Sequence, residues 1–313
     1  MTLKSPFCYP GGKSRIAPMA WQRLDGDNAI AHYIEPFLGS AAMLLARPWK
    51  FGDERVWETA NDLDGLLTNT FRGIREHPAE VAEIATACSQ SELDLHARHD
   101  WLIANRERIT AGLRADPQWC DVKAAGWWLW GMASWIGHGF GWSPSSQLPA
   151  LSPTSKGILR DPKPVKAVGA LGLHKAPPIA QWMDMLAQRL LRVRLACGDW
   201  SRVVSSAILL SCNPDFPPTA VFLDPPYERG TGYGAESAGV SADVSEWCRE
   251  NGDNPRLRIA LCGHVGDHDL PGWDTVVWKR RPGGRNAKST SSNPECVWFS
   301  PHCVGARQGS LFE

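Results

Sequence analysis

The stretch Ala220-Val221-Phe222-Leu223-Asp224-Pro225-Pro226-Tyr227 places a run of apolar residues directly before an acid, two prolines and a tyrosine. An apolar run without alternation is typical of a strand that is covered on both faces of a sheet. The two prolines remove two amide donors and stiffen the chain after the strand. In a parallel α/β sheet, ligands bind beyond the carboxyl ends of the strands, so we expect residues 224–227 to project into a binding crevice.

Other runs of the same kind predict a sheet with helices between its strands. They lie at residues 32–37, 56–60, 193–197, 257–262, 275–278 and 296–299. Helical patterns at residues 40–49 and 63–75 each follow a strand directly. This β-α-β-α spacing favours a mainly parallel, Rossmann-like α/β fold.

The middle of the 313-residue chain has a different character. From residue 77 to residue 191 the strand pattern stops, and helical segments precede a stretch rich in proline, glycine and serine at residues 137–178. Strands resume at Val193, and long loops of this kind are uncommon unless they are functional. We therefore expect residues 1–76 and 192–313 to form the core and residues 77–191 to form a mostly helical inserted subdomain.

The composition argues against some classes of protein. Lysine and arginine number 33 and equal the 33 acids, so net charge alone argues neither for nor against a nucleic-acid partner. Residues 1–15 contain no apolar stretch suited to a secretory signal. The longest apolar stretch, residues 124–136, is shorter than the ~20 residues of a membrane span, so we expect no membrane partner. Nine scattered cysteines without a C-x-x-C pair favour free thiols and a cytoplasmic location.

The residues after the apolar strand offer a particular set of contacts. The Asp224 carboxylate and the Pro225 carbonyl suit the two hydrogens of an exocyclic amino group, and Tyr227 suits stacking on a flat base. Acceptors that draw these hydrogens out of the ring plane make the amino lone pair of adenine more available, which is an effect of positioning and electrostatics. The alternative is an ordinary strand-to-loop turn built on Pro225 and Pro226.

Three weaker motifs point to a cofactor site. Gly39 allows a tight turn before a helix N-terminus, although a plain βα turn explains it equally well. Asp62 stands where a ribose is held in Rossmann-like folds, and the alternative is that Asp62 or Asp64 only caps the following helix. Near the start of the chain, Gly12 permits close approach and Lys13 offers a cation, or the segment is a flexible turn.

Taken in order, these motifs resemble those of the Dam-type (alpha-group, D12 class) DNA adenine-N6 methyltransferases. The matching motifs are Pro-Gly-Gly-Lys at residues 10–13, Glu-Pro-Phe-x-Gly at 35–39, Asn-Asp-x-Asp at 61–64, Gly-Asp-Trp at 198–200 and Asp-Pro-Pro-Tyr at 224–227. The resemblance covers both ends of the chain and not its middle. It implies a class I S-adenosylmethionine-dependent methyltransferase core, with S-adenosylmethionine as cofactor and a target-recognition role for the insertion.

The resemblance also implies roles for individual residues. Those that would bind the cofactor are Tyr9, Gly12 and Lys13 at its methionine part, Glu35, Phe37 and Gly39 around its pocket, Asp62 at its ribose, and Asp199 and Trp200 beside its adenine. Those that would hold a target adenine drawn out of the DNA stack are Asp224, Pro225, Pro226 and Tyr227. Transfer is then a direct displacement that needs no metal. One departure is Ala41, which stands where many relatives have a second glycine.

Local charge and aromatic residues suggest where DNA is held. The cations that we expect to contact phosphates are Lys279, Arg280, Arg281, Arg285 and Lys288, together with Lys156 in a second cation-rich segment. His138 lies in a glycine-rich aromatic loop that leads into that second segment. The alternative for residues 279–288 is a solvated charge run. For the apolar helix that contains Trp127, Trp128, Trp130 and Trp135, core packing is favoured over a platform for displaced bases.

A zinc site is not favoured. Histidines and cysteines between residues 262 and 303 are irregularly spaced, so we expect core thiols and loop histidines and no metal.

The sequence therefore predicts a site-specific methyltransferase that acts on the N6 amino group of adenine in double-stranded DNA. We further expect a monomer or weak dimer, which acts either alone or with a cognate restriction endonuclease as a second partner. One alternative is a methyltransferase that acts on another amino group, namely cytosine N4, RNA adenine or protein glutamine. Another is a catalytically silent DNA-binding relative.

Overall fold

The computed structural model describes residues 3–7, 9, 11–48, 56–88, 91–135, 140–142, 179–209, 217–227, 239–278 and 294–305. The chain divides into two compact units. One unit contains Met1–Arg15, Leu38–Phe51 and Ala60–Trp200, and the other contains Ile16–Phe37, Gly52–Thr59 and Ser201–Glu313.

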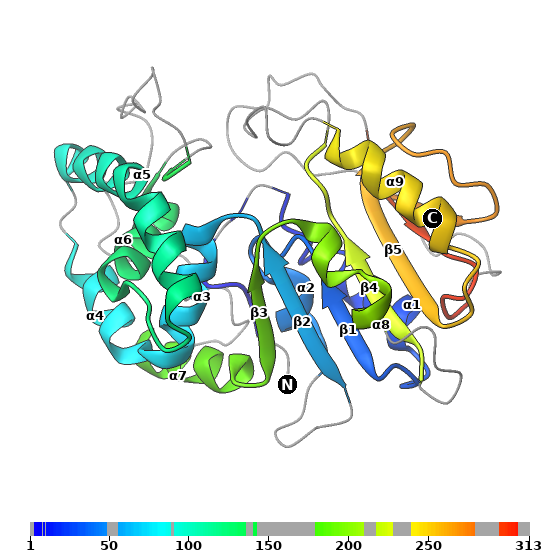
Figure 1. Ribbon diagram of the computed structural model, residues 1–313, viewed down its shortest axis with the longest axis horizontal. Coiled ribbons are helices and arrows are strands. Elements are labelled where there is room, and N and C mark those ends of the chain that lie inside the picture. Colours follow the sequence, from blue (N-terminus) through cyan, green and yellow to red (C-terminus); the bar gives the residue numbers. More distant parts are fainter. Residues whose placement is uncertain are drawn as a thin grey trace. The chain divides into compact units, whose positions relative to one another are not determined.

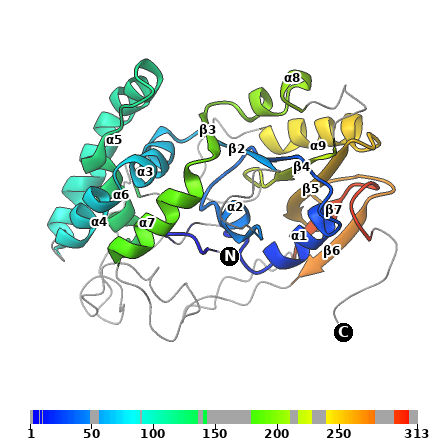
Figure 2. The same ribbon diagram turned by 90° about the horizontal axis from the view of Figure 1, so that it is seen from below.

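The described strands form one seven-stranded sheet in the order β3-β2-β1-β4-β5-β7-β6 (Figure 1 labels β1 to β5, and Figure 2 also labels β6 and β7). They are β1 (His32–Glu35), β2 (Trp57–Asp62), β3 (Val193–Cys197), β4 (Thr219–Leu223), β5 (Leu257–His264), β6 (Asp274–Trp278) and β7 (Glu295–Phe299). β4 is parallel to both β1 and β5, whereas β7 is antiparallel to both β5 and β6. The order is that of a Rossmann-like sheet, 3-2-1-4-5-6, with one antiparallel strand inserted before the edge.

The strand predictions are confirmed at all seven positions, to within two residues at most ends. Every residue of β1, β4 and β7 is buried, as expected for continuous apolar runs that are covered on both faces. β6 instead alternates between half-buried and exposed residues, and it lies at the end of the strand order. A strand at the edge of a sheet is only partly covered, which explains the alternation.

In the unit that carries β4 and β5, helices α1 (Ala17–Asp25) and α9 (Val240–Asn251) pack against β5. They lie on opposite faces of this strand (Figures 1 and 2). Buried Arg258 of β5 fixes the end of α1, because its guanidinium donates to the Leu24 carbonyl at 2.9 Å and to both Asp27 oxygens at 2.7 Å. Two short elements, η2 (Trp200–Val203) and α8 (Ser206–Leu209), precede β4.

The other unit is mainly helical. Its helices are α2 (Ala42–Ala46), α3 (Gly65–Glu76), α4 (Pro78–Ala87), α5 (Glu92–Ala115), α6 (Val122–Ser134) and α7 (Ile179–Leu190). α3 packs against α5, α6 and α7, and α4 packs against α6 and α7 (Figure 2). Among the described residues of 77–191 there are helices and no strand. The bounds of the inserted subdomain remain a prediction.

Side chains explain where these helices begin and what they bury. The hydroxyl of Ser91 accepts from the Asp94 amide at the start of α5, and the carboxylate of Asp121 accepts from the Ala124 amide at the start of α6. Trp128 and Trp130 of α6 are fully buried, which confirms core packing for these two. Trp127 and Trp135 are half-buried.

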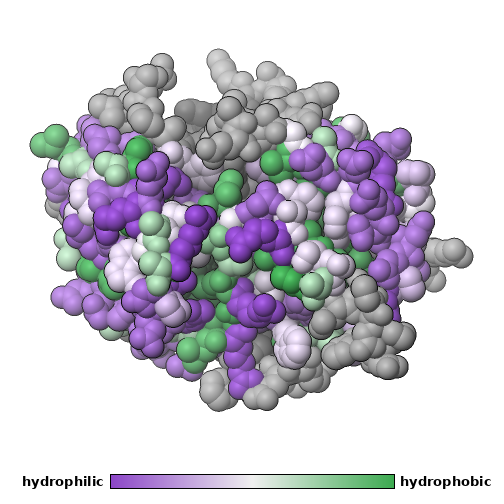
Figure 3. All heavy atoms as spheres, in the orientation of Figure 1, coloured by the Kyte–Doolittle hydropathy of each residue, from purple (hydrophilic) through white to green (hydrophobic). Residues whose placement is uncertain are grey.

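In the described part of the chain, no helix is both long and apolar enough to cross a membrane. On the face drawn in Figure 3, apolar side chains form small patches among hydrophilic ones. The large apolar residues that are exposed are Trp57, Leu63, Leu93, Leu191, Val265 and Val277.

Close packing of α4 and α6 yields a stability prediction. A Cβ atom at Gly126 would lie 2.5 Å from Cγ2 and 2.6 Å from Cβ of Ile84. Gly126→Ala should gain about 1 kcal/mol of helix propensity but lose about 1–3 kcal/mol to overpacking, so we expect lower stability in urea unfolding. In an Ile84→Gly background, where both Cγ2 and Cβ of Ile84 are gone, the cost should shrink or reverse. An equal cost in both backgrounds would contradict this packing.

Candidate active site

The ends of β2 and β3 are joined to the loop that follows β1. The Leu38 amide donates to the Asn61 carbonyl at 2.8 Å, and the Gly39 amide donates to Asp62 Oδ2 at 2.9 Å. From the other side, the Gly198 amide donates to the Asp62 carbonyl at 3.0 Å, and Asn61 Nδ2 donates to the Gly198 carbonyl at 2.9 Å. Asn61 and Asp62 therefore fix both neighbouring loops at the carboxyl end of the strands.

The two acids of this motif have different roles. Asp64 is the N-cap of α3, because its Oδ1 accepts from the Leu66 amide at 2.9 Å. Asp62 does not cap the helix, since its Oδ1 accepts from the Asp64 amide at 3.0 Å and its Oδ2 from Gly39. The capping alternative is therefore confirmed for Asp64 and not for Asp62.

Burial perturbs the ionisation of Asp62. Although the residue keeps some exposure to solvent, protein atoms surround its carboxylate, and this desolvation raises the pKa of Asp62 to about 6. The negative charge of Asp64 acts in the same direction, while the amides of Asp64 and Gly39 act against it. A perturbed carboxylate at the carboxyl end of a Rossmann-like sheet is a candidate for ligand binding.

The N-terminal motif lies against the glycine turn. A Cβ atom at Gly39, whose φ is +46°, would lie 3.1 Å from the Tyr9 ring, so the tyrosine needs a glycine there. The Gly12 amide donates to the Tyr9 carbonyl at 3.1 Å, and a Cβ at Gly12 would lie 3.9 Å from Ser40 Oγ. The ammonium group of buried Lys13 donates to the Gly11 carbonyl at 2.7 Å. The structure thus brings Tyr9, Gly12 and Gly39 together.

Ala41 has a left-handed backbone conformation, with φ of +56° and ψ of +26°, at the N-cap of α2. A side chain in this region costs of order 1–2 kcal/mol relative to glycine. Many of the methyltransferases that the motifs resemble have glycine at this position, and glycine would adopt this conformation without strain. In this chain the methyl group of Ala41 is buried there instead.

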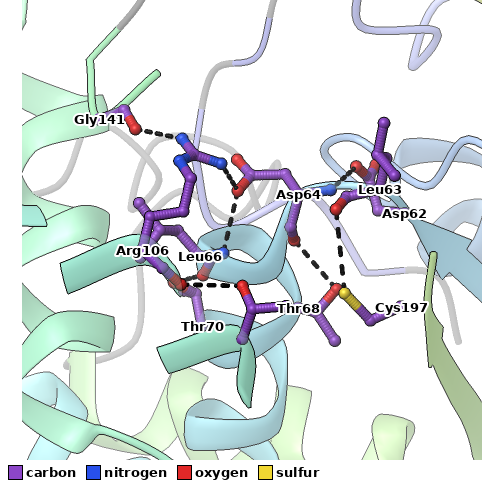
Figure 4. Close-up of polar contacts among 10 residues, drawn as sticks. Asp62, Leu63, Asp64, Leu66, Thr68, Thr70, Arg106, Gly141 and Cys197 are labelled. Carbon is purple, nitrogen blue, oxygen red and sulfur yellow. Dashed lines mark hydrogen bonds and ion pairs between the residues drawn. The ribbon is translucent and has the colours of Figure 1, made fainter. Parts of the chain in front are cut away.

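Arg106 of α5 contributes to the same region, and sequence reasoning missed it. Its Nη1 lies 2.6 Å from Asp64 Oδ1, and its Nη2 donates to the Gly141 carbonyl (Figure 4). The Gly141 amide in turn donates to His99 Nδ1 at 2.9 Å. Arg106 follows Asp64 by 42 residues on a charge-rich helix, and nothing in its local sequence distinguishes it from its neighbours.

In the other unit, the loop after β4 contains a polar contact of its own. The Tyr227 hydroxyl donates to Asp224 Oδ1 at 3.0 Å, and burial together with the Asp224 charge raises the pKa of Tyr227 well above 10. The Tyr227 ring also meets the His264 ring edge to face, with centroids 4.7 Å apart. Parallel pairing of Leu223 with Leu261 brings the ends of β4 and β5 side by side, so His264 at the end of β5 reaches this loop. Sequence reasoning considered His264 only for a metal.

The remaining predicted cofactor residues lie at or just after the ends of two strands. Glu35 and Phe37 are at the end of β1 in one unit, and Asp199 and Trp200 follow β3 in the other. Glu35 is buried at the end of β1 and accepts from the Tyr33 hydroxyl at 2.9 Å, and Phe37 is half-buried. Asp199 is exposed and Trp200 is buried directly after Gly198. Within one unit, Tyr9 contacts Gly12 and Gly39, and Gly39 contacts Asp62. Glu35, Phe37 and residues 224–227 belong to the other unit.

The predicted DNA contacts are not described by the structure. His138, Lys156, Lys279, Arg280, Arg281, Arg285 and Lys288 all lie outside the described residues and stay predictions. Within the described ranges, no group of three or more histidine, cysteine and acidic side chains is arranged to hold a metal ion.

Comparison with known proteins adds little to this geometry. No protein-family model matches the chain, and no curated protein matches it. Among solved structures, one match is the rRNA methyltransferase AviRa from Streptomyces viridochromogenes, with 14% identity over 93% of this chain and 85% of that chain, and a TM-score of 0.30. A TM-score this low does not establish a shared fold.

The raised pKa of Asp62 yields a prediction for stability. Because the folded-state pKa of about 6 lies above the ordinary value of 3.8, the folded protein binds this proton more tightly than the unfolded chain does. This group should therefore lower stability as pH rises from about 4 to about 6. Across that interval the free energy of unfolding of the wild type, relative to Asp62→Asn, should fall by roughly 3 kcal/mol.

Chemical denaturation at several pH values measures this difference. Asp100→Asn, at an exposed acid of α5, is the matched control and should show no comparable change with pH. A difference between wild type and Asp62→Asn that is constant with pH, or that grows as pH rises, would contradict the environment described for Asp62.

Proposed function

We propose that the protein is an S-adenosylmethionine-dependent methyltransferase that methylates the N6 amino group of adenine in double-stranded DNA. The observation that carries this proposal is the loop at residues 224–227. It places a carboxylate, two prolines without amide donors and a tyrosine at the carboxyl end of a buried strand. That set accepts hydrogens from an amino group and offers a flat surface to a base.

The sheet supports the proposal. Its order has one antiparallel strand, β7, between β5 and the edge strand β6. This is the arrangement expected of the class I methyltransferase core that the sequence resemblance implies. In open sheets of this kind, ligands bind beyond the carboxyl ends of the strands near the switch in strand order, which here falls between β1 and β4.

The residues around Asp62 fit S-adenosylmethionine. A carboxylate has roughly four acceptor positions, so Asp62 can accept from ribose hydroxyls beside the amides of Gly39 and Asp64. The Tyr9 ring packs against Gly39 next to this carboxylate and would offer an aromatic face to the ligand. The remaining assignments are Gly12 and Lys13 toward the methionine part, Glu35 and Phe37 in the pocket wall, and Asp199 and Trp200 beside the adenine. When bound, S-adenosylmethionine supplies an electrophilic methyl group on a sulfonium ion.

The chain's own residues would prepare the acceptor. Asp224 and the Pro225 carbonyl accept the two amino hydrogens, which holds the nitrogen lone pair out of conjugation with the ring. The Tyr227 hydroxyl orients Asp224, and it stays protonated because burial raises its pKa. Pro226 keeps the loop stiff. The amino group is out of reach within a stacked duplex, so the target base must be extruded.

Double-stranded DNA is the proposed partner. The cations at residues 279–288, with Lys156 and His138, are proposed to contact its backbone, which makes binding weaken with salt. We also propose a monomeric or weakly dimeric state. A cognate endonuclease as a second partner is proposed from the sequence resemblance alone.

Two other functions are distinguished by specific features. Cytosine N4, RNA adenine and protein glutamine all carry an amino group of the right kind, and Asp224 as the acid of the loop favours DNA adenine by family resemblance. A silent DNA-binding relative has no need of the Tyr227 to Asp224 hydrogen bond, and its presence favours catalysis.

Methyl transfer decides among these functions. Unmethylated duplex DNA is incubated with the protein and tritiated S-adenosylmethionine, and the nucleosides are then separated. We expect label in N6-methyldeoxyadenosine. Label only in N4-methylcytosine, in RNA or in protein would contradict the proposed acceptor. Absence of S-adenosylmethionine binding in calorimetry, with and without DNA, would contradict an enzyme altogether.

Asp224→Ala separates cofactor binding from chemistry. The variant should bind S-adenosylmethionine as the wild type does in calorimetry but lose at least about 100-fold in kcat, because a preorganised acceptor is missing. Asp243→Ala, at an exposed acid of α9, is the control and should keep full activity. Full activity in Asp224→Ala would show that the loop does not hold the acceptor.

A further inference from the structure

Arg106 and Asp64 form a largely buried ion pair close to Asp62. The Asp64 side chain is 1% exposed and the Arg106 side chain 27%, and their atoms approach to 2.6 Å. Asp64 Oδ2 is buried without a hydrogen-bond partner among the described residues, so Oδ1 alone receives Leu66 and Arg106. Burial raises the pKa of Asp64, and Arg106 opposes that rise. The guanidinium is therefore the main compensation for this buried carboxylate.

Asp64 is directly linked to the acid that we assign to the ribose. Its amide donates to Asp62 Oδ1 at 3.0 Å, so any shift of residue 64 moves a partner of Asp62. The charges of Asp64 and Asp62 also act on each other. Cys197 of β3 lies against the loop, with its thiol toward the Leu63 carbonyl. Arg106 is thus the cation that holds the loop of residues 62–64 in place (Figure 4).

Arg106 also reaches a second element. One end of its guanidinium meets Asp64, and the other donates to the carbonyl of Gly141, whose φ is +73°. The Gly141 amide is held by His99, and the Arg106 guanidinium lies 5.9 Å from the Trp142 ring centre. A planar guanidinium can bridge two acceptors in this way, whereas a lysine ammonium would serve one of them.

We propose that Arg106 is a positioning residue of the cofactor site: by pairing with Asp64 it fixes the loop that presents Asp62 to the ribose, and it fastens Gly141 to the same point. The inference rests on the proposed function, because it takes Asp62 as the cofactor's ribose ligand. Arg106 itself is not a catalytic residue in this arrangement.

The test compares binding of S-adenosylhomocysteine by calorimetry at pH 8, where carboxylates are ionised, at a temperature at which every variant is folded. Arg106→Gln leaves the buried Asp64 carboxylate without a cation and should weaken binding at least about tenfold, because the unpaired charge moves toward water and displaces the loop that carries Asp62. Arg106→Lys keeps the charge but loses the bridge, so its affinity should lie between those of Arg106→Gln and the wild type.

A double variant distinguishes this role from general loss of structure. Asn is as good an N-cap as Asp, so Asp64→Asn keeps the start of α3. Asp64→Asn with Arg106→Gln removes both charges and should recover affinity to within about threefold of the wild type, as expected for two directly coupled residues. If Arg106→Gln is too unstable to measure, the other two variants are compared with the wild type. The double variant must then bind within about threefold of the wild type, and Arg106→Lys must bind more weakly than the wild type.

Arg108→Gln is the matched control. Arg108 lies on the same helix, is 51% exposed and pairs with Asp121 at 2.6 Å, away from the Asp62 loop, so its loss should leave affinity unchanged. Wild-type affinity in Arg106→Gln, an equal loss in Arg108→Gln, or no recovery in the double variant would overturn the inference and leave the proposed function standing. Failure of the unsubstituted protein to bind S-adenosylhomocysteine would overturn the proposed function, and this inference with it.

Discussion

The carboxylate of Asp62 is the interaction on which the proposed site depends. It accepts the Gly39 amide from the loop after β1 and the Asp64 amide from its own loop, while its backbone carbonyl accepts from Gly198 after β3. The side chain and backbone of this one residue thus link three loops at the carboxyl end of the sheet. The cost is a carboxylate withdrawn from water, which is why its pKa is raised to about 6. A charge maintained under that penalty is the kind of feature found at binding sites.

Burial of strands made much of the fold predictable from the sequence. β3 has the predicted bounds, and β4 and β7 each extend the prediction by one residue at the start. These strands are continuous apolar runs because both faces are covered, and that pattern does not depend on distant parts of the chain. The helix start at Asp64 and the turn at Gly39 were predictable for a similar reason, since capping and left-handed backbone are local preferences.

The contacts that complete the site were not predictable in this way. Arg106 meets Asp64 only because α5 packs against α3, and the register of two long helices is set by many apolar contacts rather than by the residues that form the ion pair. His264 meets Tyr227 because β4 and β5 are parallel neighbours, which the sequence leaves open among several strand orders. Trp127 is half-buried although it shares α6 with fully buried Trp128 and Trp130, and half-buried Trp135 lies just after the end of that helix. A single stretch of sequence does not contain this information.

A crystal structure with S-adenosylhomocysteine would show whether Asp62 binds the ribose. We expect ribose hydroxyls within about 3.2 Å of the Asp62 carboxylate, with the Gly39 amide still bound to Asp62 and Arg106 still bound to Asp64. A ribose placed elsewhere, with Asp62 bound only to the backbone amides it holds already, would contradict the account.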